Sequence, residues 1–324
     1  MMSLDILRNS KMLGLGCSTF GGSNSDTDAI RALNYAYDQG IIYFDVARSY
    51  GYGKAESIVG NFALNKREKI FIASKFGIYP PSDFLLRKAL FAGVRAVKKT
   101  LPSIQRSVQL MSKRTLTKPD FSPKMTEDSL DKSLKELKTS YLDLFLFHES
   151  GLEGILREDI IYTLEKAKEK GKIRSWGGNF SNSKDAFIAL EMNKELETIQ
   201  VAFSMDNHYS QLATHKTQRI QIIYSVLNYI NNINNIKINE IVLRIKNEIP
   251  QFHLVKNIRE ILFVLAFNEL SYGIILLSMN KFDHINRNIL LSKYCILTLK
   301  QIKSIQLIMK EYLGVNAISK SAFN

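Results

Sequence analysis

The chain has 324 residues, of which 45% are hydrophobic, and carries a formal charge of +13 from 44 basic and 31 acidic residues. This length suits one large α/β barrel or two average domains, and the composition excludes a disordered chain. Two cysteines exclude a disulfide framework. The longest apolar run, residues 261–267, is far shorter than the ~20 residues that span a bilayer.

Residues 1–8 lack the basic head and apolar run of a signal peptide. Together with the two cysteines and the absence of a long apolar run, this predicts a cytoplasmic protein in a reducing compartment, without a membrane span.

Short runs rich in β-branched and aromatic residues alternate with segments whose apolar residues recur at helical spacing. In chain order, strands are predicted at 12–17, 41–46, 69–75, 141–147, 172–177, 198–203, 220–224 and 273–277. Helices are predicted at 28–38, 56–64, 128–137, 160–170, 185–194, 258–267 and 299–313. Alternation of this kind predicts a parallel sheet, and eight units favour a (β/α)8 TIM barrel over a doubly wound open sheet.

We expect one barrel domain over residues 1–324, interrupted by two long connections. The first is a basic excursion at about 78–127, whose stretch 84–119 contains nine Lys and Arg residues and no acidic residue. A cationic lid or an amphipathic contact with a membrane or partner is one interpretation. A long helical excursion with a solvated basic face is the interpretation we favour. The second connection is an Asn-rich segment of low complexity at about 226–240.

Polar residues follow nearly every predicted strand at its carboxyl end, where α/β barrels place their active sites. Tyr50 lies in the loop after the second strand. The residues that end the strands themselves are Asp45, Lys75, His148, Asn179, Gln200, Tyr224, Ser225 and Ser278.

A lysine at the end of an apolar strand needs a partner if it is buried, and Asp45 on the neighbouring strand can supply one for Lys75. A tyrosine has an ordinary pKa of about 10. We expect the Lys75 ammonium to lower the pKa of Tyr50 and so make Tyr50 a proton donor to a carbonyl oxygen. His148 can hold that oxygen. Taken alone, Lys75 is explained more simply as a surface lysine at a strand end, and His148 as a core histidine. Their occurrence on successive strand ends favours the functional interpretation.

Several of these residues stand in segments that resemble the aldo-keto reductase superfamily. The segments are LGLGCSTFGG at 13–22, FDVARSYGYGKAE at 44–56, IFIASKFG at 70–77, SLDKSLKELKTSYLDLFLFH at 129–148 and GKIRSWGGNFS at 171–181. The resemblance extends over the first 205 residues and is weak beyond them. It implies a catalytic tetrad of Asp45, Tyr50, Lys75 and His148, and an NAD(P)H-dependent reduction of an aldehyde or ketone.

The resemblance also implies a nicotinamide cofactor bound without a Rossmann fold. Asn179 and Gln200 would bond the carboxamide, Tyr224 would stack on the nicotinamide ring, and Ser225 would lie beside it. The run SMNKFDHINRN at 278–288 resembles the segment that holds the adenosine phosphate. Its matching positions are Ser278, Asn280, Lys281, His284 and Asn288.

Two departures from the family pattern affect these assignments. The usual G-x-S-N-F has one residue fewer here, so the carboxamide ligand is Asn179 or a shifted neighbour. Arg287 stands where an acidic residue is common. With Lys281 and His284, it favours the 2′-phosphate of NADPH, although NADH remains possible and all three read equally well as exposed charges.

Other signatures fail. The pair Tyr50 and Lys54 matches Y-x-x-x-K, but Gly51 and Gly53 between them disfavour the helix that this motif needs. Thr19 replaces the third glycine of a dinucleotide fingerprint. No Cys or His spacing indicates a metal site, so no metal is expected.

The positive net charge is the only indication of nucleic-acid binding, and no nucleic-acid motif accompanies it, so none is expected. We expect a small-molecule carbonyl substrate, while the oligomeric state stays open. The alternative function is a cofactor-binding regulatory or partner-binding barrel with little turnover.

Overall fold

A computed structural model describes residues 1–22, 25–79, 119–149, 151–214, 219–228 and 235–313. Eight parallel strands form a closed barrel in which each strand pairs with its neighbours in chain order, and the last pairs with the first. The predicted TIM barrel is therefore confirmed, and the open sheet is excluded. The strands are β1 (Lys11–Gly16), β2 (Tyr43–Asp45), β3 (Phe71–Phe76), β4 (Leu142–His148), β5 (Ile173–Phe180), β6 (Thr198–Ala202), β7 (Ile220–Tyr224) and β8 (Gly273–Leu277).

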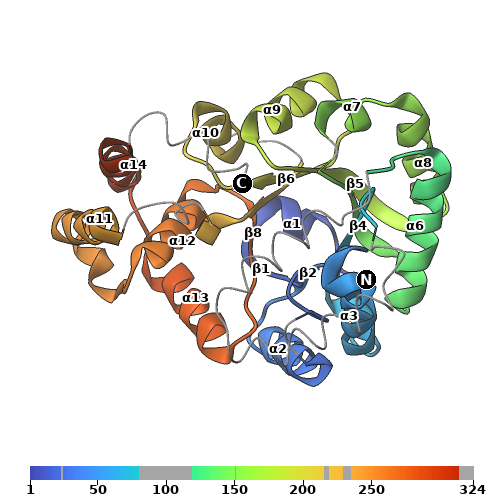
Figure 1. Ribbon diagram of the computed structural model, residues 1–324, viewed down its shortest axis with the longest axis horizontal. Helices are drawn as coiled ribbons and strands as arrows, with labels where there is room; N and C mark the ends of the chain where they lie inside the picture. Colours follow the sequence, from blue (N-terminus) through green and yellow to red (C-terminus); the bar gives the residue numbers. More distant parts are fainter. Residues whose placement is uncertain (23–24, 80–118, 150, 215–218, 229–234, 314–324) are drawn as a thin grey trace, which may run out of the picture.

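Helices surround the barrel, and most of them connect one strand to the next (Figure 1). On one side, α11 and α14 lie outside α12, and the three helices pack on one another. The α-helices are α1 (Asp5–Asn9), α2 (Asp26–Asp38), α3 (Ala55–Ala63), α6 (Pro123–Glu136), α7 (Gly151–Ile155), α8 (Glu158–Glu169), α9 (Ser183–Met192), α10 (Asn207–Thr214), α11 (Asn235–Glu248), α12 (Ile258–Glu269), α13 (Phe282–Tyr294) and α14 (Leu299–Leu313). Short 3-10 turns are η1 (Tyr50–Gly53), η2 (Arg67–Lys69), η3 (Val226–Asn228) and η4 (Pro250–Leu254).

Apolar side chains fill the barrel interior from its amino end to its middle. One cluster contains Leu4, Leu7, Tyr43, Phe71, Ala73, Leu144, Leu146, Ile220, Ile222, Ile274 and Leu276. Leu7 belongs to α1, which precedes β1 and packs against β7 and β8. The short helix therefore closes the amino end of the barrel. Side chains that follow these residues along the strands lie at the opposite, carboxyl end.

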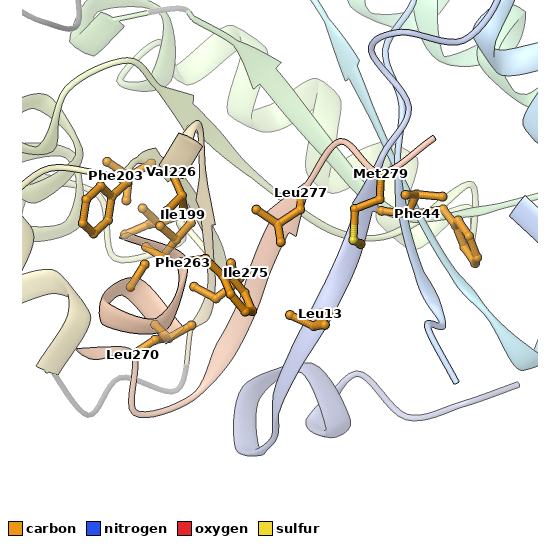
Figure 2. Packing of buried hydrophobic residues seen from close by; sticks show 14 of the residues in the cluster. Leu13, Phe44, Ile199, Phe203, Val226, Phe263, Leu270, Ile275, Leu277 and Met279 are labelled. Atoms are coloured by element: carbon orange, nitrogen blue, oxygen red, sulfur yellow. The ribbon is translucent and has the colours of Figure 1, made fainter. Parts of the chain in front are cut away.

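A second and larger cluster fills the layer between the strands and the helices. Figure 2 shows part of it, where Ile275 and Leu277 of β8 lie beside Leu13 of β1 and near Phe263 of α12. These side chains alternate along their strands with the ones that face the interior, as the twofold period of a strand requires. Both faces of each strand are thus buried, which explains why the strands read as nearly continuous apolar runs.

The predicted strand positions agree with the observed ones, with β5 as the main difference. β5 continues through Gly177 and Gly178 to Phe180, three residues beyond its predicted end. The basic stretch 84–118 lies outside the described residues, as does part of the Asn-rich segment, whose remainder includes the start of α11. Within the described ranges, no helix combines the length and apolarity needed to cross a bilayer.

Candidate active site

The register of the barrel places the polar strand-end side chains on its inner face. His148 pairs with Asn179, and Asn179 pairs with Gln200, across β4, β5 and β6. Lys75 stands two positions after the interior residue Ala73, and Asp45 two positions after Tyr43. Because side chains alternate along a strand, Asp45 and Lys75 share the inner face with the apolar interior residues.

Asp45 and Lys75 form a buried ion pair, and each side chain is 1% exposed. The Lys75 ammonium also donates to the Tyr50 hydroxyl, 3.3 Å away, and to the backbone carbonyl of Val46 at 3.4 Å. On its other side, Asp45 Oδ2 accepts a hydrogen bond of 3.1 Å from Gln200 Nε2. One continuous network therefore joins the Tyr50 hydroxyl to residues from β2, β3 and β6.

Burial raises the pKa of Tyr50 above its ordinary value, and the Lys75 ammonium offsets only part of the rise. Asp45 contributes to this result, because its carboxylate opposes the effect of the ammonium on Tyr50. The expectation that Lys75 gives Tyr50 a lowered pKa is therefore wrong in its net sign. Burial also lowers the pKa of Lys75, but Asp45 and Tyr50 outweigh it, so Lys75 stays protonated at neutral pH.

His148 lies edge-on to the Tyr50 ring, with ring centroids 5.7 Å apart at an interplanar angle of 85°. Burial, helped by the Lys75 ammonium, lowers its pKa to about 3. Its Nδ1 is buried and has no hydrogen-bond partner within the described part of the chain. The imidazole is thus neutral at physiological pH, and it keeps a buried polar atom without a partner on a ring that contacts the Tyr50 ring.

Three further residues predicted for the site, Asn179, Gln200 and Tyr224, lie on the neighbouring strands β5, β6 and β7. Asn179 is 3% and Gln200 1% exposed, and the Oε1 of Gln200 is buried without a hydrogen-bond partner among the described residues. The Tyr224 hydroxyl donates to the backbone carbonyl of Phe180 at 3.1 Å, which fixes the ring over the end of β5. The next residue, Ser225, has a left-handed backbone with φ of 57°.

A cavity of about 330 Å³ opens at this end of the barrel. Its walls come from the ends of β1, β2, β7 and β8 and from the first turn of α12. It is lined by Gly16, Ser18, Asp45, Tyr50, Tyr224, Ser225, Val226, Leu227, Arg259, Leu276, Leu277 and Ser278. The volume falls within the range of about 300–1,000 Å³ that is usual for small-molecule sites.

Two other buried carboxylates among the described residues serve as a comparison for Asp45. Glu56 accepts from Arg48 and Ser74, each at 2.7 Å, and Asp143 is bound by Arg67 and Arg174. Neither carboxylate lines the cavity. Their bonds join strands to neighbouring elements, so among these three Asp45 is the one that faces a ligand-sized space.

A family model described as the aldo/keto reductase family matches residues 12–239, which is more than two thirds of the chain. The chain belongs to the aldo/keto reductase family. The match includes all four residues of the Asp45, Tyr50, Lys75 and His148 cluster. It also includes Asn179, Gln200 and Tyr224, and it ends before β8.

Curated aldo/keto reductase relatives match only part of the chain. "Probable aldo-keto reductase 1" of Glycine max is 29% identical over 171 residues, which are 51% of this chain and 40% of the relative. "Methylglyoxal reductase YeaE" of Escherichia coli is 28% identical over 148 residues, 46% of this chain and 37% of the relative. The chain thus matches less than half of the length of each relative.

Solved structures extend the similarity in fold to nearly the whole chain. The aldo-keto reductase from Klebsiella pneumoniae in complex with NADPH superposes with a TM-score of 0.64 at 17% identity. The superposition covers 92% of this chain and 90% of that one. At this identity the similarity shows the fold alone.

The β8–α13 segment of this aldo/keto reductase does not present all of its basic residues to a ligand. Ser278 lines the cavity, whereas Asn280 and Lys281 line a separate surface hollow between α2 and α13. His284 is exposed and Asn288 half-buried on α13. Arg287 binds both carboxylate oxygens of Glu260, at 2.9 and 2.7 Å, so its charge is already neutralised.

Sequence reasoning missed two charged residues near the cavity. Glu149 directly follows His148 with a left-handed φ of 56°, and its charge acts on both Tyr50 and Tyr224. Arg259 lines the cavity from the first turn of α12. A sequence signal for Arg259 existed, since a cation at the start of a helix opposes the helix dipole and so needs another reason to be there.

Proposed function

We propose that this chain is an NADP(H)-dependent reductase that converts an aldehyde or ketone into an alcohol, with Tyr50 as proton donor. The observation that carries this proposal is the Tyr50 hydroxyl, which lies 3.3 Å from the Lys75 ammonium at the wall of the cavity. Membership of the aldo/keto reductase family and the NADPH complex of the Klebsiella structure support it.

The residues present fit a nicotinamide cofactor. Gln200 Oε1 is a buried acceptor without a partner among the described residues, and a carboxamide N–H would satisfy it. Asn179 presents a second buried amide in the adjacent strand. Gly16 lines the cavity, and a Cβ there would crowd the Ser278 hydroxyl at 3.3 Å. Tyr224 lines the same space. When bound, the nicotinamide supplies the hydride for the carbonyl carbon.

In this proposal Tyr50 donates its phenolic proton to the carbonyl oxygen as negative charge develops there. The Lys75 ammonium stabilises the phenolate that Tyr50 becomes, and Asp45 keeps Lys75 charged and in place. His148 is neutral and contributes a ring N–H that orients the oxygen, since a protonated imidazole would be too costly at this buried position.

The names of two relatives guide the choice of substrate. One is a methylglyoxal reductase and another, "Pyridoxal 4-dehydrogenase" of Microbacterium luteolum, is 41% identical over 70 residues. Both names describe reactions of aldehydes. We infer a small aldehyde as the substrate class and would assay methylglyoxal, pyridoxal and simple aromatic aldehydes.

Replacing Tyr50 with Phe tests the role of the hydroxyl. Tyr50→Phe removes the proton donor but keeps the ring, so NADPH binding should stay within about twofold while kcat falls at least about 100-fold. Binding is measured by fluorescence titration and kcat by NADPH oxidation with the best aldehyde. Tyr272→Phe, at an exposed tyrosine near the amino end of β8, is the matched control and should keep full activity.

Unchanged turnover in Tyr50→Phe would overturn the assignment. If the unmodified protein binds NADPH tightly yet reduces none of the aldehydes, the alternative of a cofactor-binding barrel with little turnover is favoured instead.

A further inference from the structure

Arg259 lines the same cavity as Tyr50 and the loops that follow β7 and β8. We propose that Arg259 binds the pyrophosphate of the dinucleotide cofactor. This inference rests on the proposed function, because it assigns one further ligand of the same cofactor. It concerns a residue that stands outside the matched range 12–239.

The position of Arg259 is unfavourable for the helix that carries it. Arg259 is the second residue of α12, where a cation faces the positive end of the helix dipole. The adjacent Glu260 does not compensate, because its carboxylate is bound by Arg287 and by the backbone N–H of Lys256 at 2.7 Å. Arg259 is exposed, and within the described part of the chain its side chain has no ion pair or hydrogen bond. Its charge is therefore available to a ligand.

The surroundings of Arg259 suit a phosphate group. Barrels of this class commonly bind phosphate at the loops after their seventh and eighth strands, and Ser225 and Ser278 stand in those two loops. The Ser278 hydroxyl lies 3.3 Å from that of Ser18, so two hydroxyls meet at this wall. Ser225 holds a left-handed backbone at a non-glycine residue, a strain that is frequent at ligand sites. An arginine fork binds two phosphate oxygens at once.

The size of the cavity distinguishes the pyrophosphate from the 2′-phosphate as the group that Arg259 binds. At about 330 Å³ it lies near the lower end of the usual range for ligand sites, and it already includes Tyr50 and Tyr224, where the nicotinamide is proposed to lie. The pyrophosphate adjoins the nicotinamide riboside, whereas the 2′-phosphate belongs to the distant adenosine. Arg259 therefore faces the pyrophosphate, which NADPH and NADH share.

Cofactor titration without substrate tests this assignment. Arg259→Ala should raise the Kd of NADPH and of NADH by similar factors of about tenfold or more, because a charge-assisted bidentate bond is lost from both. Arg259→Lys should lie between the two, since it keeps the charge but loses the fork. Lys256→Ala removes an equal charge from an exposed position before α12 and should change both Kd values less than about twofold.

Each other outcome overturns the assignment. A loss confined to NADPH would place Arg259 at the 2′-phosphate, and unchanged Kd values for both cofactors would remove it from the site. Circular dichroism and Tm establish that the variants fold. Should Arg259→Ala not fold, Arg259→Lys and Arg259→Gln carry the test.

Failure of the proposed function gives a different result. Where the unmodified protein binds neither dinucleotide, inorganic pyrophosphate becomes the ligand to measure; where it binds them without turnover, the cofactor titrations above still test Arg259. A rise in Tm with pyrophosphate that disappears in Arg259→Ala would still support an anion site at Arg259. An equal rise in both proteins, or none in either, would overturn it.

Discussion

The charges of Asp45 and Lys75 are placed where burial makes them costly. A buried ion pair rarely stabilises a fold more than apolar residues of the same size, because both charges lose their hydration. In this chain the pair touches the Tyr50 hydroxyl and one wall of a cavity. Its arrangement is better explained by the chemistry proposed for Tyr50 than by a contribution to stability.

The pKa values of Tyr50 and His148 predict how turnover depends on pH. Carbonyl reduction needs the phenol form of Tyr50, whose pKa is raised by burial, and the neutral form of His148, whose pKa is about 3. We expect kcat for reduction to stay constant between about pH 5 and 8 and to fall only in strongly alkaline solution, as Tyr50 loses its proton. Oxidation of the alcohol, which needs the phenolate, should show the opposite trend.

The profile is measured as kcat at saturating cofactor and aldehyde. His148→Gln should lower kcat while leaving the shape of the profile unchanged. A transition near pH 6–7 that His148→Gln abolishes would show that His148 titrates during turnover, contrary to this prediction.

At this scale the sequence predicted which residues meet but not their protonation. Lys75 could be matched with Asp45 because adjacent parallel strands end side by side. The net pKa of Tyr50 depends on how deeply the finished barrel buries it and on how Asp45 opposes Lys75. Neither quantity is visible in residue types and spacing. Arg259 was missed for a related reason, because the cavity that it lines forms only when the ends of β1, β2, β7 and β8 come together in the folded barrel.

Among the elements, the strands were predictable and some of the helices were not. Strands buried on both faces read as continuous β-branched and aromatic runs, and β7 and β8 agree with prediction at both ends. β5 was predicted too short because Gly177 and Gly178 resemble a strand end. A Cβ at Gly177 would lie 2.0 Å from the carbonyl oxygen of Thr198, so a close approach of β6 requires glycine there.

The helix α11 was not predicted from the sequence. Its sequence begins in the Asn-rich segment, and asparagine has a low helix propensity. The helix nevertheless packs on α12 and α14, with Ile241 and Ile245 completely buried. Tertiary packing of an amphipathic face therefore determines this helix, and local propensity does not reveal it.

The contact between α12 and α14 predicts a pH-dependent stability. Glu269 of α12 bonds Gln306 of α14, and burial raises its pKa to about 7. The folded state thus keeps this proton up to about pH 7, whereas the unfolded chain releases it near the ordinary glutamate pKa of 4.5. Stability should fall as pH rises from 4.5 to 7 and stay lower above that, by up to about 3 kcal/mol.

Glu269→Gln cannot ionise and should lose this pH dependence. Urea unfolding at about pH 5 and pH 8 measures the difference for both proteins. Glu248→Gln on α11 is the control, because Glu248 is exposed, bonds Ser304 of α14 and has a lowered pKa. Parallel pH dependences of the unmodified protein and Glu269→Gln would contradict the prediction.

At the scale of the whole molecule, the two ends of the barrel differ in what closes them. Helix α1 and its neighbour Leu4 fill the amino end, while the carboxyl end holds the cavity. Every polar residue proposed for the chemistry lies at that carboxyl end. The topology could be predicted from eight alternating units, but the closing of the amino end by α1 could not, because a five-residue helix has no detectable period.

The net charge of +13 predicts that salt weakens cofactor binding, and more strongly for NADPH than for NADH. Both cofactors are anions, and the 2′-phosphate of NADPH adds a charge of about −1.5 to −2. The Debye length shortens from about 10 Å at 0.1 M salt to about 3 Å at 1 M, so charges beyond the contact residues stop contributing.

We expect the Kd of NADPH to rise several-fold between about 0.05 and 0.5 M NaCl, and the Kd of NADH to rise by a smaller factor. Fluorescence titrations of both cofactors at each salt concentration measure this, with Tm recorded to show that the fold is intact. Equal salt dependence for the two cofactors would mean that the 2′-phosphate lies outside the positive field of the protein and that Lys281 does not reach it.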